Sequence, residues 1–371
     1  MLVGVPKEIK PGEFRVGLTP AAVGEYVAHG HEVLVETGAG AGIGAGDQVY
    51  RDAGAAIAAN AAEVFASAGM IVKVKEPQAV EWKQLRPGQI LYTYLHLAAD
   101  PAQARGLMAS GATCVAYETV TDARGHLPLL APMSEVAGRL SVQAAATALQ
   151  KANGGRGILL GGVPGVQPAK VVVIGGGVVG TQAARVAVGM GAAVSILDRS
   201  LPRLRELDDM FSGRIVTRYP TREAIAEEIA SADVVIGAVL VPGATAPKLV
   251  TRAMLKTMKP GAVLVDVAID QGGCFETSHP TTHADPTFIV DGIVHYCVAN
   301  MPGAVPLTSS AALNHATLPY GLALADRGLA AIAADPHLRN GLNVLAGRIT
   351  HRAVADSLSL EFADPDLLMA A

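Results

Sequence analysis

Cysteine and aromatic residues are scarce in this sequence, which argues against a disulfide-stabilised protein and against an aromatic core. The three cysteines, Cys114, Cys274 and Cys297, are far apart and form no C-x-x-C pair. This spacing argues against a disulfide framework and predicts reduced, buried thiols in a cytoplasmic protein. Aromatic residues make up 4% of the chain while apolar residues make up 50%, so the core must consist mainly of Val, Ala, Leu and Ile.

A strong net charge and long apolar runs are also missing. The formal net charge of −4 provides no basic surface for nucleic acid and no polybasic segment for a membrane. Arg139 and Arg185 interrupt the most apolar windows, so no transmembrane helix is expected. Lys7, Glu8 and Lys10 interrupt the start of the chain, and no secretory leader is expected.

Several catalytic signatures do not occur in the chain. There is no G-x-S-x-G, no H-E-x-x-H, no Walker lysine and no metal-binding spacing of Cys and His. These absences argue against a serine hydrolase, a zinc enzyme and a P-loop NTPase, and no bound metal is expected.

The most informative segment is 170–198, which reads KVVVIGGGVVGTQAARVAVGMGAAVSILD. The apolar run Lys170–Ile174 predicts a buried parallel strand. It leads into Gly175–Gly180, which fits G-x-G-x-x-G, and then into a helical pattern. A second apolar run, Ala193–Leu197, ends at Asp198. The order of strand, glycine turn, helix, strand and acid predicts a dinucleotide-binding site.

Each glycine of this turn has a distinct expected role. Gly175 permits the tight turn, Gly177 lets the backbone approach the pyrophosphate, and Gly180 lets the helix pack closely on the strand. The helix N-terminus offers unpaired N–H groups to the phosphates. Asp198 is placed to accept hydrogen bonds from both ribose hydroxyls.

The length of 371 residues suggests at least two domains. Strand and helix patterns alternate in residues 1–128 and again in residues 170–300, which predicts an α/β fold with two doubly wound parallel-sheet, Rossmann-like domains and a cleft between them. A long helix, with Ser134 as its N-cap, is expected over residues 134–151, and a second over residues 307–327 that leads back to the first domain. The expected domains are a discontinuous substrate domain, 1–130 plus 306–371, and an NAD-binding domain, 131–305.

Strands are expected at regular intervals in both halves, and Thr19-Pro20 predicts a helix start. The expected strands lie at or near Leu2–Val5, Glu32–Glu36, Met70–Val74, Gln89–Tyr94, Thr113–Ala116, Val171, Val194, Ile215, Val234, Val263 and Ile293.

Charged side chains stand at several of the predicted strand ends. Arg15 follows the first strand, Lys73 and Lys75 share a face of a later one, His96 ends the next, and Asp270 follows a strand of the second half. All of them are expected at the cleft, because ligands bind beyond the carboxyl ends of parallel strands. Other roles stay open: a solvated edge lysine, a structural histidine, an aspartate in a turn, or a surface arginine.

Two further polar or glycine-rich features have structural explanations. Glycines at every second position from Gly38 to Gly46 resemble a phosphate loop, but the period of two does not fit G-x-G-x-x-G, and a connection capped by Asp47 explains them better. Ser134 could either cap its helix or donate a hydrogen bond to a cofactor.

The chain resembles bacterial alanine dehydrogenase along essentially its full length. The segment VPKEIKPGEFRVGLTP is similar to the family's opening signature, and residues 170–198 are similar to its nucleotide signature. Three downstream blocks also match, namely GAVLVPGATAPKLV, MKPGAVLVDVAIDQGGCFETSHPTTHADPTF and YCVANMPGAVPLTSS. Membrane transhydrogenases are related, but the missing transmembrane segment and the run Met133-Ser134-Glu135 favour the dehydrogenase.

The resemblance implies roles for individual residues. Arg15 and Lys75 would hold the substrate carboxylate, His96 would contact the keto or amino group, and Asp270 would lie beside the reacting carbon. Pro220 departs from the hydroxyl residue common near the adenine, and it is left out of the site. The residues implied to line the cofactor are Ser134, Gly175, Gly177, Val178, Gly180, Asp198, Arg203, Val239, Val267, Asp270, Val298, Asn300 and Met301. The family further implies a homo-hexamer.

The expected reaction is the reversible oxidative deamination of L-alanine by NAD and water to pyruvate, ammonium and NADH. A small carboxylate is bound well by a bidentate guanidinium, here Arg15, and Lys75 adds a second charge. His96 and Asp270 can transfer protons or stabilise the cationic imine, with the division of roles left open. Asp198 favours NAD, although arginines at 199 and 203 could accept a 2′-phosphate.

Two alternatives remain at this level. A dehydrogenase for another small amino acid or hydroxy acid would have the same sequence features, because pocket size is not visible in a sequence. A nucleotide-sensing, transhydrogenase-like subunit without dehydrogenase activity would bind NAD but would not need the proton-transfer groups His96 and Asp270.

Overall fold

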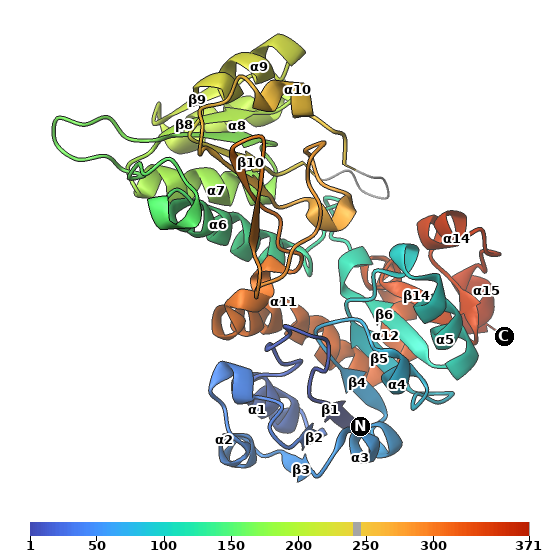
Figure 1. Ribbon diagram of the computed structural model, residues 1–371. Helices are drawn as coiled ribbons and strands as arrows, with labels where there is room; N and C mark the ends of the chain where they lie inside the picture. The colour runs from blue at the N-terminus through green and yellow to red at the C-terminus, as the bar shows by residue number, and fades with distance from the viewer. Residues whose placement is uncertain (240–245, 371) are drawn as a thin grey trace. The chain divides into compact units, whose positions relative to one another are not determined.

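The computed structural model describes residues 1–239 and 246–370 and divides the chain into two compact units (Figure 1). Unit 1 comprises Met1–Met133 and Val305–Ala371, and unit 2 comprises Ser134–Ala304. Both are α/β structures around a mostly parallel sheet, which confirms the predicted fold class. Part of the family-like block at residues 237–250, namely 240–245, lies outside the described residues.

The described part of unit 1 contains an eight-stranded sheet in the order β15-β14-β6-β5-β4-β1-β2-β3. The pairs from β3 through to β6 are parallel, and β14 pairs antiparallel with both β6 and β15. The strands are β1 Leu2–Val5, β2 Glu32–Glu36, β3 Ala56–Ala58, β4 Met70–Val72, β5 Ile90–Thr93, β6 Thr113–Ala116, β14 Leu342–Leu345 and β15 Arg348–Ile349.

The strand order of unit 1 reverses beside β1. The chain runs outward from β1 to β2 and β3 on one side, and then from β4 to β5 and β6 on the other. Such a reversal leaves a crevice beyond the carboxyl ends of β1 and β4, where ligands bind in open α/β sheets. The loops after these two strands carry Arg15 and Lys75.

The helices of unit 1 cover its sheet, and their starts follow from local sequence. Thr19 caps α1 by accepting a hydrogen bond from the Ala22 N–H, and Pro20 occupies the first turn as predicted. The helices are α1 Pro20–Ala28, α2 Asp47–Asp52, α3 Ala61–Ser67, α4 Ala79–Trp82, α5 Pro101–Ser110, α11 Pro306–Arg327, α12 Leu329–Ala334, α13 Pro336–Arg339, α14 Arg352–Leu358 and α15 Pro365–Ala370.

The described part of unit 2 contains a seven-stranded sheet in the order β12-β13-β11-β10-β7-β8-β9. Only the β12–β13 pair is antiparallel, and the order reverses between β7 and β10. The strands are β7 Lys170–Ile174, β8 Ala193–Leu197, β9 Ile215–Arg218, β10 Val234–Gly237, β11 Val263–Asp266, β12 Thr287–Val290 and β13 Ile293–Tyr296. The helices are α6 Ala131–Ala148, α7 Val178–Gly189, α8 Leu201–Phe211, α9 Arg222–Ser231 and α10 Arg252–Leu255.

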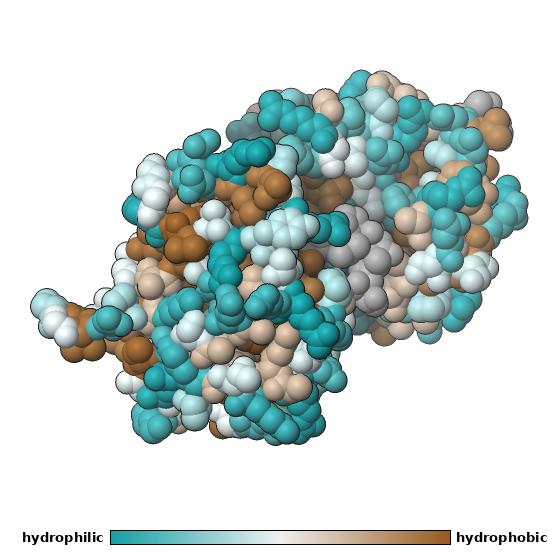
Figure 2. Space-filling view, turned by 90° about the horizontal axis from the view of Figure 1, so that it is seen from above, coloured by the Kyte–Doolittle hydropathy of each residue, from teal (hydrophilic) through white to brown (hydrophobic). Residues whose placement is uncertain are grey.

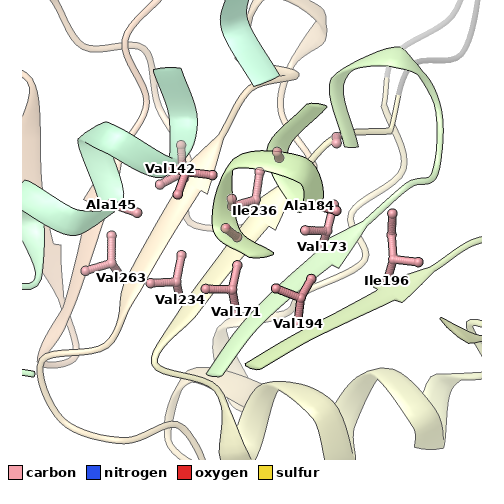
Figure 3. Packing of buried hydrophobic residues seen from close by; sticks show 14 of the residues in the cluster. Val142, Ala145, Val171, Val173, Ala184, Val194, Ile196, Val234, Ile236 and Val263 are labelled. Carbon is pink, nitrogen blue, oxygen red and sulfur yellow. The ribbon is translucent and has the colours of Figure 1, made fainter. Parts of the chain in front are cut away.

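The core of unit 2 is aliphatic, as the composition predicts. Figure 3 shows α6 and α7 above the sheet, with Val142 and Ala145 of α6 facing Val263 and Val234. The β-branched side chains of β7 and its neighbours suit strands that are covered on both faces. Small buried residues such as Ala184 on α7 let the helix approach the sheet closely enough for its aliphatic side chains to pack.

The long connecting helix begins earlier than predicted. The prediction placed it at residues 134–151 with Ser134 as N-cap, but α6 runs over Ala131–Ala148. Pro132 is tolerated because the first-turn N–H groups of a helix have no partner within the helix. The N-cap role of Ser134 is therefore wrong, since this residue lies inside the first turns of α6. The boundary between the two units falls at Met133, within the same helix.

One loop of unit 2 carries apolar side chains on an exposed arm. The arm, residues 157–168, precedes β7 and is the green loop at the left of Figure 1; Figure 2 shows brown side chains on the same projection. Leu159, Val163 and Val166 are 65%, 53% and 62% exposed. At its tip, Val163 and Val166 form an isolated bridge closed by Pro164-Gly165, with a φ of +83° at the glycine that fits a type II turn.

None of the described helices has the length and apolar character that crossing a bilayer requires. The three cysteines are free and buried. Burial raises the pKa of the Cys274 thiol to about 12, so this thiol stays protonated at neutral pH.

Candidate nucleotide and substrate site

The three residues predicted to bind substrate follow neighbouring strands of unit 1. Arg15 lies in the loop after β1, Lys75 in the loop after β4, and His96 directly beyond β5. The loop of Arg15 is pressed against the end of β4, because a Cβ placed on Gly17 would lie 2.3 Å from the carbonyl oxygen of Val72. The sheet thus brings the predicted cationic and imidazole groups to one edge of unit 1.

The Arg15 guanidinium is buried and held by a neighbouring acid. Arg15 is only 2% exposed, and its Nε and Nη2 donate to Glu13 at 2.7 and 2.6 Å. Its Nη1 donates to the sulfur of Met133 at 3.0 Å. Burial lowers the pKa of Arg15, but the hydrogen bonds and charge of Glu13 outweigh that effect and raise it, so the group stays charged. Arg15 is therefore not the surface cation considered as an alternative.

Lys73 has a structural role that the sequence interpretation did not assign. Strand β4 ends at Val72, and the Lys73 side chain is fully buried with Nζ at 3.0 Å from Glu8 and 2.8 Å from Glu81. Burial lowers the pKa of Lys73, but the two carboxylates outweigh it and raise the pKa, so the lysine is charged. The expectation that Lys73 faces the cleft with Lys75 is wrong, because a buried charge needs the partners that it has here.

The same buried acid fixes the backbone that carries Lys75. Glu8 Oε1 accepts hydrogen bonds from the N–H groups of Val74 at 2.6 Å and Lys75 at 3.4 Å. The Lys75 side chain is partly buried, and its ammonium lies 3.9 Å from Glu76. Glu8 thus couples the buried ion cluster to the position of Lys75.

His96 adopts a conformation that is unusual for a residue with a side chain. Its φ is +50°, in the left-handed region, and its imidazole is exposed. The ring stacks on Tyr94, with 5.7 Å between centroids and 9° between planes, and Tyr94 donates its hydroxyl to the Leu129 carbonyl at 2.6 Å. Strained backbone persists only where surrounding contacts impose it, and it concentrates at functional sites.

The glycine turn of unit 2 has the geometry that its sequence predicts. Gly175 has a φ of +107°, and a Cβ on it would lie 2.6 Å from the Ala238 carbonyl oxygen. A Cβ on Gly180 would lie 1.8 Å from the Gly175 oxygen, so only glycine lets α7 approach β7 here. A Cβ on Gly177, the N-cap of α7, would meet no atom within 4 Å. Space therefore exists where phosphate would approach the helix N-terminus.

Asp198 and Arg203 both contact the peptide of Gly176. Asp198 accepts the Gly176 N–H at 2.7 Å and the Ser200 N–H at 2.8 Å. Arg203 donates Nε to the Gly176 oxygen and Nη2 to the Thr181 hydroxyl, each at 2.7 Å, and pairs with Glu206. Arg203 thus stabilises the glycine turn by binding the Gly176 carbonyl and the Thr181 side chain.

The other residues expected to line the cofactor differ in how far their side chains are exposed. Val178, the first residue of α7, is 43% exposed, and Ser134, Val239 and Val267 are partly buried. Asp270 is exposed in a 3₁₀ turn, Ile269–Gln271, and Asn300 has a φ of +62°. The side chains of Val298 and Met301 belong to the hydrophobic core, so only their main chain can face a ligand.

The loop that carries Asp270 is fixed by a buried carboxylate. Asp266, at the end of β11, accepts the Ser278 hydroxyl at 2.6 Å and the N–H groups of Cys274 and Phe275. Burial raises the pKa of Asp266 against these hydrogen bonds. These hydrogen bonds hold residues 274–278 against the end of β11, so the loop that carries Asp270 stays close to that strand end.

The second glycine-rich segment is a closed loop. Asp47 Oδ2 accepts the Thr37 hydroxyl at 2.6 Å, and Oδ1 accepts the Gly38 N–H at 2.8 Å. Gly46 rather than Asp47 is the N-cap of α2. Asp47 stabilises this connection, as the sequence predicts, but it does so as the first residue of α2 and not as its N-cap.

Comparison with known proteins identifies the family. Residues 4–137 match the N-terminal domain of the alanine dehydrogenase/PNT family, and residues 141–352 match its C-terminal domain. The chain belongs to this family. It is 59% identical to the alanine dehydrogenase of Halomonas elongata over 365 residues, which cover 98% of each chain.

Solved structures agree with this assignment. A structure named L-alanine dehydrogenase matches with a TM-score of 0.94 at 52% identity, covering 97% of this chain and 99% of the other. A transhydrogenase from Sinorhizobium meliloti matches with a TM-score of 0.81 at 28% identity, covering 95% of this chain and 100% of the other. The predicted resemblance is confirmed, and the dehydrogenase is the nearer of these two structures.

Several side chains of the site were missed by sequence reasoning. Glu13 binds Arg15, Glu81 binds Lys73, and Glu118 accepts a hydrogen bond from the backbone of His96. None of these three acids belongs to a recognisable sequence motif. A signal existed for one of them: Lys73 stands inside an apolar run, and a buried lysine requires acidic partners.

Proposed function

We propose that this protein catalyses the reversible, NAD-dependent oxidative deamination of L-alanine to pyruvate and ammonium. The observation that carries the proposal is the set of Arg15, Lys75 and His96 at adjacent strand ends in a chain that matches both domains of the family. The alanine dehydrogenase named above, at 59% identity over nearly the whole chain, supports alanine as the substrate.

The residues of unit 2 fit a nicotinamide dinucleotide. The unfilled space at Gly177 and the unpaired N–H groups at the start of α7 suit a pyrophosphate. When bound, NAD would accept a hydride from the α-carbon of alanine. The residues proposed to hold it are Ser134, Gly175, Gly177, Val178, Gly180, Asp198, Arg203, Val239, Val267, Asp270, Val298, Asn300 and Met301.

NAD is proposed over NADP because of Asp198. This carboxylate uses one hydrogen bond on each oxygen and retains lone pairs for ribose hydroxyls, whereas it would repel a 2′-phosphate. Arg199, which is exposed, and Arg203 are the side chains that could offset the repulsion, but the Arg203 guanidinium already binds the Gly176 oxygen, Thr181 and Glu206. Arg203 is therefore proposed to support the turn from behind rather than to bind a phosphate.

Arg15 and Lys75 are proposed to bind the substrate carboxylate. Glu13 binds Nε and Nη2 of Arg15, and the substrate is proposed to be bound at the Nη1–Nη2 end of the guanidinium, where it would compete with the Met133 sulfur that accepts from Nη1. Glu13 fixes the plane of that end, and Glu8 fixes the backbone of Lys75, so both cations are oriented before substrate arrives.

His96 and Asp270 are proposed as the proton-transfer and charge-stabilising groups. Hydride leaves the α-carbon more readily from a neutral amine, so a base must remove a proton, and water must then be deprotonated to attack the imine. Both side chains are exposed on their units and can exchange protons with solvent or substrate. Asp270 would also stabilise the positive charge of the imine.

The direct test is an amino-acid screen. Purified protein, NAD and single L-amino acids are mixed at mildly alkaline pH, and NADH fluorescence is followed. A signal with alanine that exceeds those with glycine and serine is expected. Equal signals would broaden the substrate class, and NADH binding without turnover would replace the proposal by a nucleotide-sensing role.

We further propose that the protein is a homo-oligomer, a hexamer by its family resemblance, with the 157–168 arm at an interface between copies. Leu160 anchors the base of the arm in the core of unit 2, whereas Leu159, Val163 and Val166 remain exposed on it. An apolar tip on a projecting arm is stabilised by contact with another chain. The proposed occupant is a second copy, because a homo-oligomer requires interfaces between copies and the arm presents exposed apolar side chains for one.

The arm is tested by the mass of the particle in solution. Replacing Val163 and Val166 by Asp should lower the mass measured by light scattering, while Val80→Asp, at an equally exposed position of unit 1, should not. An unchanged mass in the arm variant would contradict the assignment of this interface.

A further inference from the structure

The peptide that joins Leu95 to His96 is held by side chains at both of its polar groups. The Leu95 carbonyl accepts a hydrogen bond from Nε2 of Gln103 at 3.0 Å. The His96 N–H donates to Oε1 of Glu118 at 2.6 Å, and the Leu95 N–H lies 3.2 Å from both oxygens of the same carboxylate. Because the plane of this peptide sets the φ of His96, these contacts hold the residue in its left-handed conformation.

The position of Glu118 follows from strand register. In the parallel pair of β5 and β6, Thr93 lies opposite Ala116. Glu118 stands two residues past Ala116, as Leu95 stands two residues past Thr93, and it occupies a 3₁₀ turn, Tyr117–Thr119. Its carboxylate thus supplies acceptors to the chain of β5 just beyond the point where the strand ladder ends.

A carboxylate suits this place better than a neutral acceptor. Hydrogen bonds from N–H groups to an ionised acceptor are shorter and stronger than those to a neutral one, and the contact to His96 at 2.6 Å is short. Gln103 is fully buried and can act only from the other side of the peptide. Glu118 is half-buried and lies on the element next to His96.

We propose that Glu118 is a positioning residue for the reaction: it clamps the Leu95–His96 backbone and so sets the direction of the His96 imidazole. This inference rests on the proposed function, in which His96 transfers protons. The backbone of His96 fixes the direction in which its side chain leaves the chain, and the stacking on Tyr94 fixes the plane of the imidazole ring.

The test is a double-mutant cycle of Glu118→Ala and His96→Ala with L-alanine and NAD. Glu118→Ala should lower kcat by about 10- to 100-fold, the loss expected when a catalytic group shifts by about 1 Å, with KM for NAD unchanged. In the His96→Ala background the same change should lower kcat by less than about twofold, because residues that act as one unit are not additive.

Asp122→Ala is the matched control. Asp122 closes a nearby turn by accepting the N–H groups of Arg124 and His126, both at 2.8 Å, and contacts nothing at His96. This variant should keep the kcat of the unmodified chain. Glu118→Gln retains one acceptor oxygen, so it should lose less activity than Glu118→Ala, and it replaces that variant in the cycle if the alanine form does not fold.

Amide hydrogen exchange distinguishes a failure of this inference from a failure of the proposed function. Over residues 90–99, Glu118→Ala should exchange faster than Asp122→Ala, whether or not the protein oxidises alanine. Unchanged exchange, or losses in kcat that multiply fully in the double variant, would overturn the role of Glu118. An unmodified chain without alanine oxidation but with slow exchange at Leu95 and His96 would overturn the proposed function and leave the clamp standing.

Discussion

A methyl group added at Gly177 should separate cofactor binding from folding. Gly177 is the N-cap of α7, with a φ of −67° that alanine can adopt, and a Cβ there would meet no atom within 4 Å. The fold therefore has room for Gly177→Ala. A pyrophosphate bound at the helix N-terminus would clash with the added methyl group, because its oxygens would approach the backbone at that point.

The two effects have different expected magnitudes. Replacing a glycine stabilises the folded state by about 0.4–1 kcal/mol through the unfolded chain, while alanine is worse than glycine as an N-cap by up to about 1 kcal/mol. These nearly cancel, so Tm should change by less than about 3 °C. Crowding of a closely packed ligand costs about 1–3 kcal/mol, so the Kd for NADH should rise about 5- to 150-fold.

Two other glycines of the same segment serve as controls. Gly180→Ala would place its Cβ 1.8 Å from the Gly175 oxygen, so it should lower both Tm and affinity. Gly189→Ala, at the far end of α7, has open space, so it should leave the affinity unchanged and should not lower Tm. The measurements are calorimetric melting and titration with NADH. A Gly177→Ala protein that binds NADH as tightly as the unmodified chain would refute the placement of the pyrophosphate.

Three further outcomes are expected. Asp198→Ala should raise the ratio of kcat/KM with NADP to that with NAD, and an unchanged ratio would contradict its contact with the ribose. Lys73→Met should lower the free energy of unfolding by about 3–5 kcal/mol in urea titrations, because it leaves Glu8 and Glu81 buried without their cation. Burial lowers the pKa of His295 below 6.5, so the unfolded chain binds more protons and stability should fall as pH drops below about 6.5, by at most about 1.4 kcal/mol per pH unit. His295→Asn should flatten that slope between pH 7 and 5, and a slope equal to that of the unmodified protein would show that other groups produce it.

The parts of the fold with strong local patterns were predictable from sequence. Every strand expected from apolar runs is present, and the glycine turn has the expected geometry because close backbone contacts at Gly175 and Gly180 leave no room for a side chain. Strand β3, Ala56–Ala58, was missed because alanine carries little strand preference. The β14–β15 hairpin was missed because its turn places Ala346 and Gly347 at positive φ, where Asn-Gly is the usual signal.

The positions of Arg15 and His96 beyond strand ends could be predicted from the sequence, whereas the contacts that support them could not. Arg15 and His96 stand out because they follow strands, and the sheet indeed places them at one edge. Glu13 and Glu118 act through distances of 2.6 Å that depend on how loops and 3₁₀ turns close, and no spacing in the sequence encodes those. Ser134 was misassigned because Pro132 can enter the first turn of a helix.

The antiparallel pairing of β14 with β6 has a consequence for synthesis on the ribosome. Strand β6 ends at Ala116, but its partner begins at Leu342, so the nascent chain must be extended across all of unit 2 before the sheet of unit 1 can close. At about 5–20 residues per second, this delay is on the order of 10–45 s. During that time β6 presents an open edge to neighbouring nascent chains, and premature termination before Leu342 would make the exposure permanent.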